Sequence, residues 1–183
     1  MPLDKAGLPR RRSIRLAGFD YSLNSSYFVT VCSYRRECTF GIVDSAIHLS
    51  EPGKIVEEEW QRVAQRRGYV QLEASVVMPN HCHMLFTLMR EGEDDRRGVA
   101  RYARHCGAFK GPPPDSVGAI IRGFKSGVTR RARSELGIKG PIWQRGYFDR
   151  VVDSDKKFVA AWRYIEQNQA RWLDDHYNPA RRQ

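Results

Sequence analysis

Two histidines separated by one residue, His81 and His83, are the side chains whose types and spacing most directly suggest chemistry in this sequence. Successive side chains of an extended strand point to opposite faces, so these two imidazoles are expected on the same face. Neutral imidazoles side by side form part of a metal site, because their ring nitrogens are good metal ligands. Surface histidines at the mouth of a hairpin would give the same motif, so further residues are needed to decide.

The histidines open an apolar run, residues 81–88, which follows a Pro-Asn turn and an earlier apolar run, residues 69–77. Strand alternation puts Leu85 and Thr87 on the histidine face. The opposite face is apolar throughout and carries Cys82, Met84, Phe86 and Leu88. We therefore expect the apolar face to pack against helices and the histidine face to lie on the more open side of a sheet.

A phenol and a carboxamide, Tyr164 and Asn168, stand four residues apart in a pattern that predicts a helix over residues 155–173. They therefore share one helical face beside an expected apolar stripe. That stripe comprises Phe158, Trp162, Ile165 and Trp172. Tyr147 is the alternative phenol, in an aromatic and arginine-flanked segment, but it lacks a polar partner one helical turn away.

These residues form a coherent set for attack on a phosphodiester. Tyrosine is a weak nucleophile at its ordinary pKa, and the reaction needs a cation to polarise the non-bridging oxygens. His81, His83 and the side-chain oxygen of Asn168 could hold Mg²⁺ or Mn²⁺ with positions left for phosphate and water. Attack by Tyr164 would leave a 5′-phosphotyrosyl link and a free 3′ hydroxyl.

The remaining patterns predict a strand over residues 27–34, a hairpin within 40–49, a helix over about 51–67 capped by Ser50, and a strand over 142–152. A further helix begins at Ser116. Its apolar face carries Val117, Ile120, Ile121, Phe124 and Val128. The order βαββαβ predicts an α+β, ferredoxin-like sandwich, with an antiparallel sheet, helices on one face, and a C-terminal helix carrying the proposed nucleophile.

The chain is strongly basic: its 183 residues carry a formal net charge of +10 with a pI near 9.8, which favours a polyanionic partner, above all nucleic acid. No run approaches the roughly 20 apolar residues of a membrane span, and the cysteines show no C-x-x-C spacing. We expect a cytoplasmic protein without a membrane segment, a zinc knuckle or a disulfide framework. The residues expected to contact DNA are Arg10, Arg11, Arg12, Arg122, Lys125, Arg130, Trp143 and Arg145, although Trp143 could instead be a core residue.

The expected organisation is a basic arm over residues 1–18, one domain over 19–175 and a tail over 176–183. Residues 90–115 interrupt the domain with an acidic patch and a triple proline, as a long loop or insertion. Whether the chain is a monomer or a homodimer is left open.

Several segments together carry a resemblance to a known family over nearly the whole chain. His81-Cys82-His83, preceded by Val77-Met78-Pro79-Asn80, resembles the His-hydrophobe-His motif of the HUH single-strand endonucleases. More specific are Tyr27-Phe28-Val29-Thr30, Ile121-Arg122-Gly123-Phe124-Lys125-Ser126, Ile142-Trp143-Gln144-Arg145-Gly146-Tyr147-Phe148 and Arg163-Tyr164-Ile165-Glu166-Gln167-Asn168. Together they resemble the REP-associated tyrosine transposases, relatives of the single-tyrosine insertion-sequence transposases.

This resemblance implies a ferredoxin-like core and the cutting and joining of single-stranded DNA at palindromic hairpins. By it, Tyr164 matches the catalytic tyrosine, His81 and His83 match the metal-binding pair, and Asn168 matches the polar third ligand. The family usually reads Asn-Pro after the tyrosine, whereas this chain has Asn168-Gln169. The alternative hypothesis is a domesticated protein that binds single-stranded or hairpin nucleic acid without cleaving it; a zinc-dependent structural module is disfavoured by the cysteine spacing.

Overall fold

The computed structural model describes residues 20–21, 23–90, 112 and 114–182, so the expected basic arm with Arg10, Arg11 and Arg12, and most of the 90–115 segment, lie outside the described residues. The strands are β1 (Ser26–Cys32), β2 (Gly41–Val43), β3 (Ile47–Leu49), β4 (Val70–Met78), β5 (His81–Leu88) and β6 (Phe148–Val152). The helices are α1 (Glu51–Arg66), α3 (Val117–Leu136) and α4 (Asp155–Glu166), with short 3-10 turns at Tyr34–Arg36, Trp172–Asp174 and Pro179–Arg182.

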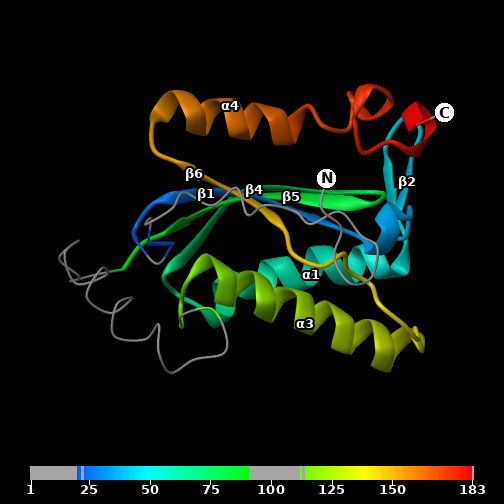
Figure 1. Ribbon diagram of the computed structural model, residues 1–183, viewed down its shortest axis with the longest axis horizontal. Coiled ribbons are helices and arrows are strands. Elements are labelled where there is room, and N and C mark those ends of the chain that lie inside the picture. Colours follow the sequence, from blue (N-terminus) through cyan, green and yellow to red (C-terminus); the bar gives the residue numbers. More distant parts are fainter. Residues whose placement is uncertain (1–19, 22, 91–111, 113, 183) are drawn as a thin grey trace, which may run out of the picture.

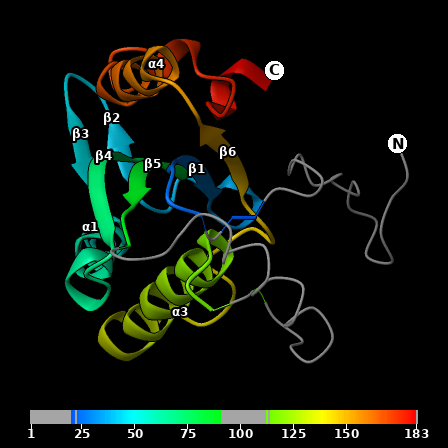
Figure 2. The same cartoon turned by 90° about the vertical axis from the view of Figure 1, so that its left-hand side faces the viewer.

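The central sheet has four strands in the order β4-β5-β1-β6, and every neighbouring pair is antiparallel. Helices α1 and α3 cover one face and α4 covers the other, which gives three layers (Figures 1 and 2). The short β2-β3 hairpin forms a separate two-stranded sheet. The predicted ferredoxin-like sandwich with an added C-terminal helix is therefore confirmed.

The main core lies between the sheet and the pair α1 and α3, where the predicted apolar face of β5 packs. Phe86 of β5 meets the Trp60 indole edge-on, with 5.4 Å between ring centroids. Both helices begin at a serine cap: the hydroxyl of Ser50 accepts from the Gly53 amide at 3.2 Å, and that of Ser116 from the Ala119 amide at 3.3 Å. Of the helices described, none is long and apolar enough to cross a membrane.

The predicted strand over 142–152 is wrong in its first half, since β6 begins only at Phe148. Gly146 has a left-handed φ of 77°, which interrupts an extended chain. The Lys125 ammonium donates to the carbonyls of Gln144 at 2.8 Å and of Gly146 at 3.0 Å. Before β6 the segment pairs with the end of β1 only through an isolated bridge between Ser33 and Trp143.

The predicted helix over 155–173 is also too long, since α4 ends at Glu166. Beyond it the backbone makes tighter turns, such as the bond from the Asn168 amide to the Ile165 carbonyl at 3.2 Å. Trp162 is 42% exposed and not part of the buried stripe. The residues that pack on the sheet are Phe158, Ala161 and Ile165, which places Trp162 at the margin of the contact.

A close contact between α1 and the loop before β2 holds the histidine turn in position. The Phe40 amide donates to the Pro79 carbonyl at 2.8 Å, and the Phe40 carbonyl accepts from the Ser50 amide at 3.0 Å. A Cβ added to Gly53, in the first turn of α1, would lie 2.0 Å from that carbonyl oxygen. Only glycine therefore allows α1 to approach this backbone so closely.

We expect Gly53→Ala to be destabilising, because an overlap with a backbone carbonyl can be relieved only by moving α1 away from the loop. Gly123→Ala in α3 is the matched control, since its nearest non-local atom would be 3.9 Å away, on the Arg67 side chain. Replacing glycine by alanine favours a helix at the control position, whereas the overlap opposes it at Gly53, so urea denaturation should separate their free energies of unfolding by about 2 kcal/mol or more. Equal stabilities of the two variants would contradict this account of the contact.

Candidate active site

The antiparallel register of β1 and β5 sets up the histidine pair. His83 lies directly opposite Thr30, and residues directly opposite each other in a ladder share a face. The Thr30 hydroxyl is accordingly 2.8 Å from Nδ1 of His83. Phe28, two residues before Thr30, stacks on the His83 ring with 5.3 Å between centroids. The strand pattern thus predicts the shared face, and the partner strand supplies the groups that fix the ring.

The prediction that the histidines face the more open side of the sheet is wrong. The exposed fractions of His81 and His83 are 0% and 2%. Helix α4 and the chain beyond it lie over this face (Figure 1), and the Tyr177 ring lies 4.5 Å from the His81 ring, centroid to centroid. The cover comes from the C-terminal segment, which folds back once α4 has ended.

The side chain of Asn80 joins three segments of chain beneath this cover. Its Nδ2 donates to the carbonyls of Arg36 at 3.1 Å and of Tyr177 at 2.8 Å, and Oδ1 lies 2.9 Å from Nδ1 of His81. Two carbonyl acceptors fix the orientation of the amide, so Oδ1 must accept from a protonated Nδ1. The Nε2 atom of His81 therefore carries the lone pair of the ring, and it lies 3.1 Å from Nε2 of His83.

Both imidazoles are available as neutral ligands. Burial lowers the pKa of His83 to about 3, with a further contribution from His176. The pKa of His81 is lowered well below its ordinary value by burial first, and then by electrostatic interactions with His83, His176 and Arg36. Their Nε2 atoms face each other at 3.1 Å. The two ring nitrogens are thus close enough to serve as ligand atoms for one cation.

Tyr164 projects from the last turn of α4 toward the histidine pair. Its ring lies edge-on to that of His83, with 5.0 Å between ring centroids. Burial, and then the Asp175 carboxylate, raise the pKa of its phenol, while a hydrogen bond from Asn168 and the charge of Arg171 lower it. Asn168 itself is 2% exposed. Among the described residues its Oδ1 has no hydrogen-bond partner, an uncompensated buried acceptor that fits a ligand directed at a cation.

Asp175 is a site residue that the sequence did not predict. Its carboxylate, Nε2 of His81 and a ring nitrogen of His83 form a group whose ligand atoms all lie within 4.8 Å of one another. The distance from Asp175 Oδ2 to His81 Nε2 is 3.7 Å. Asp175 follows the expected helix without any spacing that relates it to the histidines, so its contribution depends on how the chain turns after Glu166.

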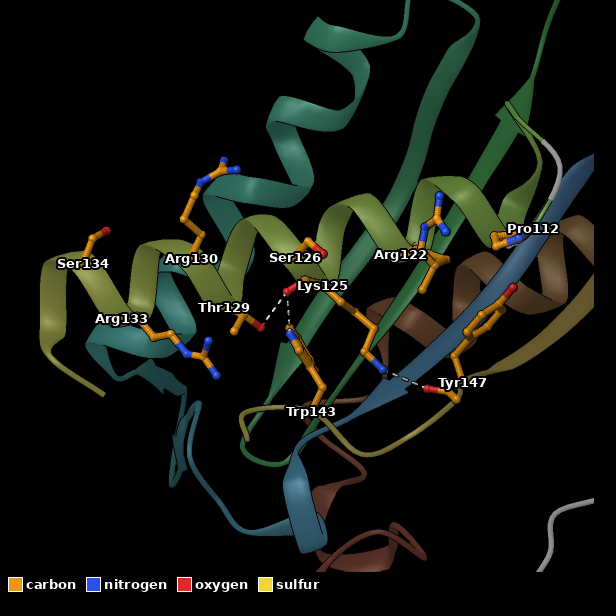
Figure 3. Close-up of a pocket in the computed structure, with 13 residues that line it drawn as sticks. Pro112, Arg122, Lys125, Ser126, Thr129, Arg130, Arg133, Ser134, Trp143 and Tyr147 are labelled. Atoms are coloured by element: carbon orange, nitrogen blue, oxygen red, sulfur yellow. Dashed lines mark hydrogen bonds between the residues drawn. The ribbon is translucent and has the colours of Figure 1, made fainter. Parts of the chain in front are cut away.

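The expected DNA-contacting residues of α3 line a separate groove of about 1180 Å³, on the face of the sheet opposite the histidines (Figure 3). Arg122 and Arg130 are exposed there, together with Arg133. Lys125 lines it too, but its ammonium is held by the two loop carbonyls described above. Arg145 is exposed on the same loop.

Two aromatic residues of that loop, Trp143 and Tyr147, lie away from the histidine pair. Trp143 is 9% exposed, packs on Phe40 and Phe124, and donates its indole N–H to the Lys125 carbonyl at 3.1 Å, as expected for a core residue. Tyr147 lines the groove over α3, and no histidine is among the described residues around that groove. Of the two phenols weighed from the sequence, Tyr164 is thus the one that lies beside the histidine pair, where the Tyr177 ring also lies against His81.

No family model matches the chain. It is 30% identical over 174 residues to an uncharacterized protein of Haemophilus influenzae, an alignment covering 93% of this chain and 94% of that protein. The chain therefore belongs to the same family as this Haemophilus influenzae protein.

Among solved structures, a REP-associated tyrosine transposase bound to a REP hairpin is similar with a TM-score of 0.55 and 20% identity, over 89% of this chain and 72% of that chain. This likeness shows that the two proteins share a fold. A candidate transposase from Deinococcus radiodurans aligns over 85% of this chain and 98% of that one, at 18% identity and a TM-score of 0.46, which is too low to support an argument.

The Asn80 contacts generate a stability prediction. Asn80→Ala would leave the Nδ1–H of His81 and two backbone carbonyls without partners in a buried site, so we expect the free energy of unfolding to fall by about 2–4 kcal/mol. Asn24→Ala is the control. The Asn24 side chain also makes two bonds, both to the backbone of Arg90, but it is exposed and water can replace it.

We expect the control to lose less than about 1 kcal/mol in the same urea titration. A similar loss in both variants would mean that the Asn80 network contributes no more than an ordinary surface contact.

Proposed function

We propose that this protein is a single-stranded DNA endonuclease and strand transferase that uses Tyr164 as nucleophile and a divalent metal as cofactor. The observation that carries the proposal is the position of Tyr164 in the same chain, with 5.0 Å between the centroids of its ring and the His83 ring. A phenol, two neutral imidazoles and a carboxylate gathered in one buried cluster are suited to phosphodiester attack.

The donor groups fit a cation of the Mg²⁺ or Mn²⁺ class. His81, His83 and Asp175 would hold it, with the uncompensated Oδ1 of Asn168 as a further ligand. A carboxylate and a carboxamide are hard oxygen donors, and the two imidazoles make Mn²⁺ at least as suitable as Mg²⁺. Such a cation polarises the non-bridging oxygens of a phosphodiester and neutralises their charge.

The chain's own residues would position the reacting groups. Phe28 and His83 pack against the Tyr164 ring and so set the direction of its phenol oxygen. A bond forms from that oxygen to phosphorus as the bond from phosphorus to the 3′ oxygen breaks. The phenol loses its proton to solvent and the departing 3′ oxygen takes one up, so a free 3′ hydroxyl and a 5′-phosphotyrosine result. Reversal of the step rejoins a strand without ATP.

The proposed substrate is a strand with palindromic hairpins. Support comes from the fold shared with a transposase bound to a REP hairpin and from the motifs that resemble that family. The groove over α3, with Arg122, Arg130 and Arg133 exposed along it, offers the positive charge that a folded nucleic acid needs.

The test uses hairpin oligonucleotides drawn from repeats near the gene, incubated with Mn²⁺ or Mg²⁺ and separated in SDS. A 3′ label should move with the protein, while a 5′ label should appear on a shortened free strand that ends in a 3′ hydroxyl. Tyr164→Phe should abolish the adduct, because it removes the attacking oxygen. Tyr147→Phe, in the groove over α3, should retain it.

An adduct that survives Tyr164→Phe would contradict the proposed nucleophile. Binding of the hairpins by the wild-type protein without any adduct would favour the non-cleaving alternative. A 5′ label that moves with the protein would reverse the proposed polarity of the linkage.

A second prediction concerns the metal alone and needs no DNA. Thr30→Val removes the hydroxyl that orients His83 while nearly keeping its shape, so we expect Mn²⁺ affinity to fall about 10- to 100-fold. Thr87→Val is the control: this hydroxyl, on the same face of β5, bonds Ser26 and Glu73 instead. Free Mn²⁺ measured by electron paramagnetic resonance gives both affinities, and equal values would argue against His83 as a ligand.

A further inference from the structure

The turn that follows β1 is conformationally unusual and lies next to the histidine pair. Arg35 and Arg36 have left-handed φ angles of 53° and 58°, a conformation that residues with a side chain rarely adopt. Glycine would adopt it without strain, yet two arginines occupy the positions. Strained backbone of this kind clusters at functional sites and persists only where the surrounding structure holds it in place.

Buried contacts hold the turn in this conformation. The Ser33 hydroxyl donates to the carbonyls of Glu37 at 2.7 Å and of Asn80 at 3.0 Å. The Arg36 carbonyl accepts from the Asn80 side chain, which also contacts His81. The network that orients the histidine therefore fixes the backbone of Arg36.

The guanidinium of Arg36 is directed along the cover of the site. It lies over the Tyr177 ring, 4.7 Å from the centroid, and that ring in turn lies over His81. Arg36 is half-buried, and no carboxylate of the described residues forms an ion pair with it. A stacked guanidinium keeps its edge N–H groups available in a fixed plane, which suits a phosphate.

The turn also connects the site to the groove over α3. The Tyr34 amide donates to the Ile142 carbonyl at 2.7 Å, at the start of the loop that carries Trp143 and Gly146 along the groove. The same turn reaches the histidine turn through the Ser33 amide, which donates to the Asn80 carbonyl at 2.9 Å, so Arg36 lies between the loop beside the groove and the histidine site.

We propose that Arg36 binds a phosphodiester of the DNA strand entering the site, as a phosphate-binding residue separate from the metal ligands. This inference rests on the proposed function for its substrate class. It explains why a strained position carries an arginine, and why the cation stacks toward the histidines without an acidic partner among the described residues.

The test measures binding of a short, unstructured oligo-dT by fluorescence anisotropy in EDTA, at a series of KCl concentrations. Tyr164→Phe serves as the parent, so that cleavage plays no part. Loss of one phosphate contact to a single strand should reduce the slope of log affinity against log salt by about 0.7. We expect this reduction for Arg36→Gln and also for Arg36→Gly, which relieves the left-handed strain and so should remain folded.

Arg35→Gln and Arg35→Gly are the matched controls. They remove the same charge at a neighbouring left-handed position, but the Arg35 guanidinium lies over the exposed Tyr34 ring, 5.3 Å from its centroid. Their salt slopes should equal that of the parent. Equal slopes for the Arg36 variants and the parent would overturn the proposal, and so would equal reductions at both positions.

The experiments can contradict either of the two proposals without contradicting the other. If the hairpin adduct forms through Tyr164 but the Arg36 slope is unchanged, the phosphate site is wrong and the proposed nuclease function stands. If no adduct forms but the slope falls only in the Arg36 variants, the phosphate site stands without cleavage.

Discussion

Two imidazoles buried side by side must find polar partners, and the rest of this site follows from that constraint. A buried polar group without a hydrogen bond destabilises the fold, so each ring nitrogen directed away from the shared point is bonded, one to Thr30 and the other to Asn80. Asn80 in turn fixes the carbonyls of Arg36 and Tyr177. One buried amide thus ties the histidine turn to the end of β1 and to the C-terminal segment.

The two faces of the sheet differ in their apolar packing, and this difference allows polar groups to be buried on one of them. The face toward α1 and α3 holds the large apolar core, whereas the buried cluster under α4 is small and centred on Leu85, Val152 and Ile165. Apolar burial on the face toward α1 and α3 stabilises the sheet independently of the side chains on the face under α4. The second face can therefore use its area for imidazoles, a carboxylate and a carboxamide without loss of the fold.

Local patterns in the sequence predict the parts of the structure that local physics determines. Alternation gives the bounds of β5 and the shared face of His81 and His83, and side-chain capping gives the start of α1 at Ser50. The end of α4 is different. Nothing in the period of its apolar residues marks Glu166 as the last helical residue, because the chain leaves the helix to make contacts with β5 and the turn at Asn80 that are distant in sequence.

That single departure accounts for most of what the sequence did not predict in the site. In a helix continued to residue 173, Asn168 would lie one turn above Tyr164, and Asp175 and Tyr177 would lie beyond its end. Because the chain turns at Gln167 instead, Asp175 reaches the histidines. The aromatic cover over His81 arises from the same turn, and it is this cover that orients Arg36. The position of Asp175, the covered face and the stacked arginine are therefore consequences of one helix end.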